Sequence, residues 1–163
     1  MGKEEMPPGQ DLPQKAKMIL HKSNKNVIVD SCIWFALFNK SDGNHKKALT
    51  IIKNIDNQNI LCPWPILLET LNTRFVKDKI NLSNFNSRLK HFTLIDDQHY
   101  RKQALEATLY NAIAGKRYIS LVDMVIRYIL SDKKTHAINY LATFNIEDFI
   151  DVCKERKITI LQE

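Results

Sequence analysis

Four acidic side chains follow closely on short apolar runs of the sequence. The stretches are VIVDS, PILLETL, SLVDM and FNIEDF, and the acids are Asp30, Glu69, Asp123 and Asp148. Carboxylates that are brought together repel one another unless a cation neutralises them. Oxygen ligands without a Cys or His cluster favour a hard cation, Mg2+ or Mn2+. A water held by that ion would attack a phosphodiester in line, so the chemistry expected of these residues is phosphodiester hydrolysis.

Asp30 and Glu69 also have ordinary structural explanations when each is considered alone. Asp30 can be the N-cap of the helix that follows it, its side chain accepting a backbone N–H that has no other partner. Glu69 lies off the apolar stripe of its helix and can be a solvated acid. Its position, in the first two turns after the second strand, still brings it near the edge of the sheet where Asp30 is expected.

Asp123 and Asp148 have similar explanations. Asp123 can close a capping box with Ser120 or pair with Arg127 one turn later. Asn145 can cap the next helix, with Asp148 in its first turn, where the helix dipole favours an anion. These explanations weaken when they are taken together. A serine or threonine would serve as a cap, yet four strand exits each carry an acid or its amide.

The elements that must position these acids alternate between strands and helices. Strands are expected at 27–30, 60–62, 92–96, 136–143 and 158–161, with a short one at 118–120. Helices are expected from Ser31 onward and at 44–55, 63–77, 83–91, 97–114, 121–130 and 146–156. Such alternation predicts right-handed crossovers and an α/β three-layer domain, with a mostly parallel sheet covered by helices on both faces. In such sheets the active cleft lies at the carboxyl ends of the strands.

Length and composition limit the class of protein. The 163 residues fit one domain, which we expect at 26–163 after a flexible basic tail at 1–25. The net charge of +6 suits a polyanionic partner such as RNA. Three scattered cysteines predict a reduced protein of the cytoplasm without a disulfide frame or zinc site. No run is long enough to span a membrane, so no membrane association is expected.

The stretches VIVDSCIWFALF, LLET, ISLVDMVI and LATFNIEDF together resemble the PIN domain, and in particular its small prokaryotic, toxin-like (VapC-like) branch. The likeness covers about residues 26–161. Each motif is short, but the ordered set is fairly specific. The resemblance implies a three-layer fold with a parallel sheet of four or five strands, and a Mg2+- or Mn2+-dependent ribonuclease. It makes Asp30, Glu69 and Asp123 the metal-binding acids.

The fourth position departs from the common pattern of the family. Many relatives carry an aspartate directly after the threonine motif, where this chain has Asn145, with Asp148 one turn later. The resemblance gives Asp148 the acidic role and makes Asn145 a neutral metal ligand or hydrogen-bond donor. Ser31 and Thr143 would contribute hydroxyls beside the ligands or to the phosphate. The family also suggests two protein partners, an antitoxin and a second copy of the chain.

Two other classes of function compete with the nuclease. A phosphatase would require a second aspartate two residues after the first, where this chain has Cys32, and a receiver domain would require paired early acids and a late strand-end lysine. A PIN-like module that has lost catalysis and serves in RNA binding or assembly is the stronger alternative, because Asn145 replaces an acid. The function expected is a metal-dependent endoribonuclease. The resemblance also suggests that it is the toxin of a toxin–antitoxin pair.

Overall fold

The structure is a computed structural model, and it describes residues 25–134 and 136–162. The tail expected at 1–25 lies outside the described residues except for Lys25, so its flexibility stays a prediction. No helix in the described ranges is long and apolar enough to cross a membrane.

Five parallel strands form one sheet in the order β3-β2-β1-β4-β5. The strands are β1 (Asn26–Val29), β2 (Asn59–Pro63), β3 (Thr93–Ile95), β4 (Ile138–Ala142) and β5 (Thr159–Leu161). In the central strand, β1, the β-branched residues Val27, Ile28 and Val29 are almost wholly buried, as expected for a parallel strand covered on both faces. The predicted α/β fold with an all-parallel sheet is therefore confirmed, and every strand delivers its carboxyl end to the same edge.

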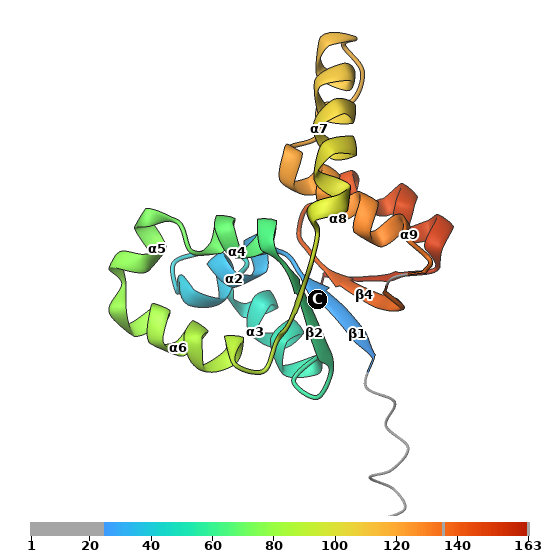
Figure 1. Cartoon of the computed structure of the whole chain (residues 1–163). Coiled ribbons are helices and arrows are strands. Elements are labelled where there is room, and N and C mark those ends of the chain that lie inside the picture. Colours follow the sequence, from blue (N-terminus) through green and yellow to red (C-terminus); the bar gives the residue numbers. More distant parts are fainter. Residues whose placement is uncertain (1–24, 135, 163) are drawn as a thin grey trace, which may run out of the picture.

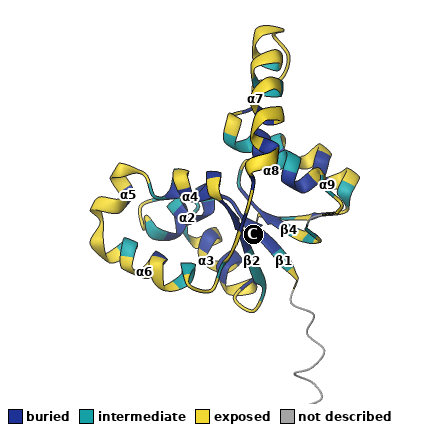
Figure 2. Ribbon diagram, viewed as in Figure 1, coloured by how far each residue is buried: buried dark blue, intermediate teal, exposed yellow. Residues whose placement is uncertain are grey.

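Helices cover both faces of the sheet (Figure 1). On one side lie α2 (Ser31–Phe38), α3 (His45–Asn54), α4 (Trp64–Thr70), α5 (Thr73–Lys77) and α6 (Lys79–Leu89). On the other lie α8 (Leu121–Ser131), the short 3-10 helix η1 (Ile146–Asp148) and α9 (Ile150–Arg156). The long helix α7 (Gln98–Ile113) packs along α8 and projects beyond the sheet, and most of its outer length is exposed (Figure 2).

The structure corrects four expected element boundaries. The helix expected at 63–77 is broken, because Asn72 Oδ1 accepts the N–H groups of Arg74 and Phe75 and so caps a new helix, α5. The helix expected at 83–91 begins earlier, at Lys79. Residues 118–120 form no strand, and the helix expected at 146–156 is divided into η1 and α9 around Phe149.

The core lies against the sheet and holds an aromatic cluster under α2, α5 and α6. Trp34 is 1% exposed, and its ring meets Phe85 edge-on at 5.5 Å between centroids. Phe75 and Phe38 extend this cluster toward the surface. The three cysteines are free thiols, as predicted.

Candidate active site

Asp30 leaves the central strand with its carboxylate 4% exposed. It occupies the N-cap position of α2 but makes no side-chain cap hydrogen bond, so the capping explanation of this acid is wrong. Its Oδ2 instead accepts the hydroxyl of Thr143 at 2.7 Å and the thiol of Cys32 at 3.2 Å. Among the described residues no lysine or arginine pairs with this buried carboxylate. Its charge is held by neutral donors alone.

Thr143 joins the exits of the two neighbouring strands β1 and β4. The residue is completely buried, and while its hydroxyl donates to Asp30 it accepts the backbone N–H of Asn145 at 3.0 Å. The Asp30 N–H continues the ladder by donating to the Ala142 carbonyl oxygen at 3.0 Å. The position of the Asp30 carboxylate is thus fixed from both strands.

Ser31 connects Asp30 with Glu69, which comes from a different strand–helix unit. The Ser31 hydroxyl lies 2.7 Å from Glu69 Oε2 and 3.4 Å from Asp30 Oδ1, so its stronger hydrogen bond is donated to the glutamate. Glu69 is half-buried on α4, and the Asn72 side-chain amide donates to its backbone carbonyl at 2.9 Å. Glu69 is therefore not a solvated acid but part of the group at the strand exits.

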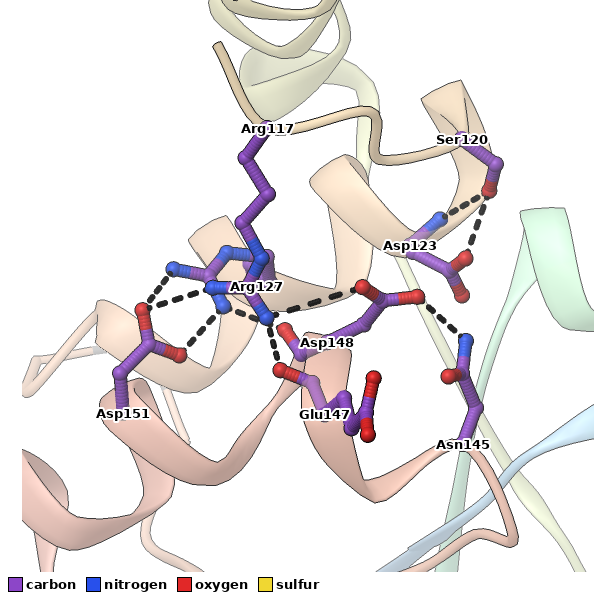
Figure 3. A network of polar contacts seen from close by, with 8 residues as sticks. All are labelled: Arg117, Ser120, Asp123, Arg127, Asn145, Glu147, Asp148 and Asp151. Atoms are coloured by element: carbon purple, nitrogen blue, oxygen red, sulfur yellow. Dashed lines mark hydrogen bonds and ion pairs between the residues drawn. The ribbon is translucent and has the colours of Figure 1, made fainter.

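Asp123 lies in the first turn of α8, where Ser120 caps the helix. Its backbone N–H donates to Ser120 Oγ at 3.0 Å, and the Ser120 hydroxyl donates to Asp123 Oδ2 at 2.8 Å (Figure 3). The Ser120 half of the expected capping box is confirmed, whereas the Asp123 carboxylate accepts the Ser120 hydroxyl and not its backbone N–H. The predicted pairing with Arg127 is wrong, because that guanidinium binds Asp151 instead.

The electrostatics of Asp123 link it to the other three acids. The pKa of its carboxyl is raised to about 6, chiefly by burial; the hydrogen bond from Ser120 opposes this rise, and the charges of Asp30, Asp148 and Glu69 contribute to it. The charges of the other three predicted acids therefore act on Asp123. Whether each of them serves catalysis stays a prediction.

Asp148 and Asn145 lie on the turn that follows β4. Asn145 does not cap a helix with its side chain, contrary to expectation; its amide Nδ2 donates to Asp148 Oδ2. Arg117 approaches the other oxygen, Oδ1, at 3.6 Å (Figure 3). Asp148 therefore differs from Asp30 and Glu69 in having a cation beside it.

Two arginines hold this turn against α8 (Figure 3). Arg127 makes two hydrogen bonds to the Asp151 carboxylate, at 2.6 and 2.7 Å, and also donates to the backbone carbonyl of Asp148. Arg117 donates to Asp151 at 3.1 Å and to the Glu147 carbonyl. The hydrogen bonds from Arg127 and its charge lower the pKa of the Asp151 carboxyl below its ordinary value.

Sequence reasoning missed two neighbours of the site, Cys32 and Asp151. The Cys32 thiol donates to Asp30, and its pKa is raised to about 12 by burial and by the Asp30 charge. One signal for it was available: residue 32 lies two positions after the acid in the first turn of a helix. Asp151 carries no such signal, because its pairing with Arg127 depends on how α8 and α9 pack.

The side-chain donor atoms of the site are of the kind that hard cations prefer. Its acids offer only oxygen atoms, and burial of uncompensated carboxylates is unfavourable without a positive partner. In residues 25–134 and 136–162, however, no three His, Cys, Asp or Glu side chains are already gathered around a single metal position. Mg2+ commonly binds through one or two carboxylates and several waters, so two of these acids would suffice.

Comparison at the level of sequence gives no relative: no protein-family model matches this chain, and no curated protein matches it. Solved structures do match. The five-stranded parallel sheet with helices on both faces is the PIN-like α/β fold that the sequence resemblance predicted.

Two of the matching structures are of VapC and VapBC proteins. The first, VapC20 of Mycobacterium tuberculosis, described as a toxin that cleaves the sarcin–ricin loop, gives a TM-score of 0.59 at 19% identity over 77% of this chain and 94% of that one. The second, VapBC2 of Rickettsia felis bound to a fragment of its promoter DNA, gives a TM-score of 0.51 at 16% identity over 83% of this chain and 96% of that one. At these identities the likeness establishes the fold.

Proposed function

We propose that this protein is a metal-dependent endoribonuclease of the toxin type. The observation that carries the proposal is the state of Asp30 and Glu69, two acids at the exits of adjacent strands. Hydroxyl groups hold both, and no described lysine or arginine neutralises either. Buried carboxylates arranged in this way favour a cation supplied from solution.

The residues of the chain have separate roles in this mechanism. Asp30, Glu69 and Asp123 hold Mg2+ or Mn2+, while Ser31 and Thr143 orient the two acids that their hydroxyls contact. The bound ion supplies charge stabilisation for the phosphate and a nucleophilic water. Keeping the carboxylates deprotonated is the task of their surroundings, and binding of a cation favours the charged form of Asp123.

Asn145 and Asp148 have supporting roles at the fourth position. Asp148 shares its charge with Arg117, so it is a weaker cation ligand than Asp30, and Asn145 acts as the donor that orients it. Either residue would contribute a carboxylate or amide oxygen as an additional ligand. The acids that would hold the ion most tightly are therefore those on β1, α4 and α8.

RNA is the proposed substrate, for reasons of charge and of likeness. The chain carries a net charge of +6 even with its acids counted, which favours a phosphate backbone. VapC20, which shares the fold, is described as cleaving the sarcin–ricin loop, an RNA, and VapBC2 is a complex in which a toxin-like chain has a partner. We accordingly propose a cytoplasmic toxin that an antitoxin inhibits and that pairs with a second copy.

The direct test is cleavage of a pool of structured and single-stranded RNAs by purified protein in Mg2+, Mn2+ or EDTA. Asp123→Asn should abolish cleavage, whereas the matched change Asp96→Asn, at an exposed acid that only closes a local turn, should retain it. Cleavage that persists in EDTA, or in Asp123→Asn, would exclude the proposed mechanism.

A second candidate function is an RNA-binding or assembly module without catalysis. It is favoured by the absence, in the described part of the chain, of three acids gathered around one position, and by the ion pair between Arg117 and Asp148. Thermal unfolding separates the candidates. An ion that binds only the folded nuclease raises its melting temperature as Mn2+ increases, whereas a module without a metal site shows no such shift.

A further inference from the structure

A cavity of about 460 Å³ is lined by residues of α2, α5 and α6 and of the loop after α2. These helices lie on the same side of the sheet as α4, which carries Glu69 (Figure 1). Its volume lies within the range of roughly 300–1,000 Å³ usual for ligand sites. The lining combines aromatic rings with amide, carboxylate and guanidinium groups, among them Phe35, Asn39, Asp42 and Arg74. None of these four residues has a part in the proposed catalytic group.

Aromatic rings form the apolar part of the cavity. Phe38 and Phe75 meet edge-on with their centroids 5.5 Å apart, and both are braced by the buried ring of Phe85. Phe35 is half-buried, and no other ring in the described part of the chain stacks on it. An aromatic ring that lies beside well-packed neighbours and has no other ring stacked on it can serve as a stacking platform for a nucleobase.

Two polar side chains in the cavity each have one polar atom without a partner among the described residues. Asn39 Oδ1 accepts the Ser41 N–H at 3.2 Å, and its amide Nδ2 has no partner among the described residues. Asp42 Oδ1 accepts the Asn44 N–H at 2.8 Å, and its Oδ2 is likewise without a donor. The local turn fixes both side chains, so one donor group and one acceptor remain for the edge of a base.

One cation, Arg74, lines the cavity, together with Asp42 and Asp78. Arg74 is exposed and makes no ion pair with any described acid. A neighbouring hollow of about 690 Å³ shares Phe38 and Asn81 with the cavity, and its lining includes Lys40 and Arg88, of which Arg88 is paired with Asp56 at 3.7 Å. Arg74 and Lys40 are therefore the cations available to a phosphate along these two hollows.

The cavity is connected to the acids through α2 and Asn72. Ser31, which binds Glu69, and Phe35 are one helical turn apart and so lie on the same face of α2. Asn72 lines the cavity and also donates to the Glu69 backbone carbonyl. From Ser31 to Asn39 the helix rises about 12 Å, at roughly 1.5 Å per residue, which is a length of about two nucleotides.

We propose that this cavity is a nucleobase subsite for single-stranded RNA, about two nucleotides from the scissile phosphate. The inference rests on the proposed nuclease function and adds to it the residues that select sequence. One base stacks on Phe35 while Asn39 and Asp42 read its hydrogen-bonding edge, and Arg74 binds the adjoining phosphate. A base that offers neighbouring donors and an acceptor, as guanine does, matches this pair of groups.

The test is a binding selection from RNA with eight randomised nucleotides, using the full chain with Asp123→Asn so that bound RNA stays intact. Enrichment of one base at one or two adjacent positions is expected. Asn39→Asp and Asp42→Asn each keep the oxygen that closes the local turn and change only the group offered to the base. Each should reduce that preference about tenfold, the discrimination that one good base contact supplies.

Two controls distinguish base reading from other effects. Asp96→Asn is matched to Asp42→Asn, because Asp96 accepts the N–H two residues on at 2.9 Å in the same kind of turn, and it should leave the preference unchanged. Arg74→Ala should weaken binding of all sequences alike and reduce the dependence of log K on log salt by about 0.7, as the loss of one phosphate contact requires. Circular dichroism melts establish that each variant is folded.

The remaining outcomes would overturn the inference. A preference that survives in both cavity variants, or equal weakening for every base, would show that the cavity does not read sequence. If wild-type protein with Mg2+ still cleaves RNA in that case, the nuclease function stands and only the subsite fails. If the chain neither cleaves RNA nor selects it, both proposals fail, and the cavity would be left to a protein partner.

Discussion

The two sides of the candidate site hold their acids by opposite means. On the β1 side, Asp30 and Glu69 accept hydrogen bonds from hydroxyls, and no described cation neutralises them. On the η1 side, Arg117 and Arg127 surround Asp148 and Asp151. Neutral donors fix a carboxylate in place and leave its charge uncompensated. Guanidinium groups fix a carboxylate and also neutralise its charge. The first side is therefore suited to binding a cation, and the second is suited to holding a turn of backbone.

Replacement of a carboxylate on the β1 side should give the largest effect. Asp30→Asn retains an oxygen that can accept the Thr143 hydroxyl, so the protein should fold. Cleavage should fall by more than the roughly 10- to 100-fold that changes behind a metal ligand cost. Cleavage rates on an RNA that the wild-type protein cuts measure the loss of activity. Thermal unfolding with increasing Mn2+ measures folding and metal binding. If Asp30→Asn cleaves RNA at the wild-type rate, the β1 side does not have the cation-binding role that distinguishes it from the η1 side.

A change to the hydroxyls should rank second. Thr143→Val removes the donor to a buried carboxylate, which should lower the free energy of unfolding by about 1–3 kcal/mol and cleavage by about 10- to 100-fold. Thr70→Val is its matched control, because Thr70 is also 0% exposed but its hydroxyl has no hydrogen-bond partner in the described part of the chain. That change should leave stability unchanged or raise it by about 1 kcal/mol. Equal losses in urea denaturation of the two variants would contradict the role given to Thr143.

Loss of an arginine on the η1 side should affect stability more than chemistry. Arg127→Gln breaks a partly exposed pair with Asp151 and removes a donor to the Asp148 carbonyl, at a cost of about 1–2 kcal/mol. Because this side anchors the turn, cleavage should fall less than about tenfold. Lys154→Gln, at an exposed cation of α9, is the control. Loss of cleavage as large as in Asp30→Asn would mean that the η1 side takes part directly.

The smallest effect should be on the pH dependence of stability without metal. The pKa of Asp123 is 3.8 ordinarily and about 6 in the folded protein, so the folded state binds more protons between these values. Stability should therefore fall as the pH rises through this window and then become constant. Asp123→Asn should remove that slope in urea melts with EDTA. Asp151 acts in the opposite sense, because its pKa is lowered in the folded protein. Its contribution to stability is fully present at pH values above its pKa in the unfolded chain, and it is lost as the pH falls.

Much of the fold could be read from the sequence because its signals are local. Short β-branched runs separated by helical segments fix a parallel sheet, and the ends of such strands must meet at one edge. The break before α5 was missed, because Leu71 and Phe75 continue an apolar helical spacing across the Asn72 cap. The apolar spacing alone predicts one continuous helix, whereas the Asn72 side chain caps a new helix at this point.

The placement of the four acids near the strand exits was predictable from the sequence, but their hydrogen-bonding partners were not. Asp30, Glu69, Asp123 and Asp148 could be selected from position alone, since each follows an apolar run. That Arg127 binds Asp151 and not Asp123 depends on the packing of α8 against α9, which no spacing records. The burial that raises the Asp123 pKa is likewise a property of the assembled layers.

The hydrogen bond between Thr143 and Asp30 joins residues that lie 113 positions apart in the chain. A contact of such long range costs more loop-closure entropy than a local contact. It also requires both strands, and during synthesis β1 emerges long before its neighbour β4. A ribosome that releases the chain after residue 123 but before residue 143 would produce a fragment that has Asp30, Glu69 and Asp123 but cannot assemble their setting. The order of translation thus keeps the proposed nuclease inactive until nearly the whole domain has been made.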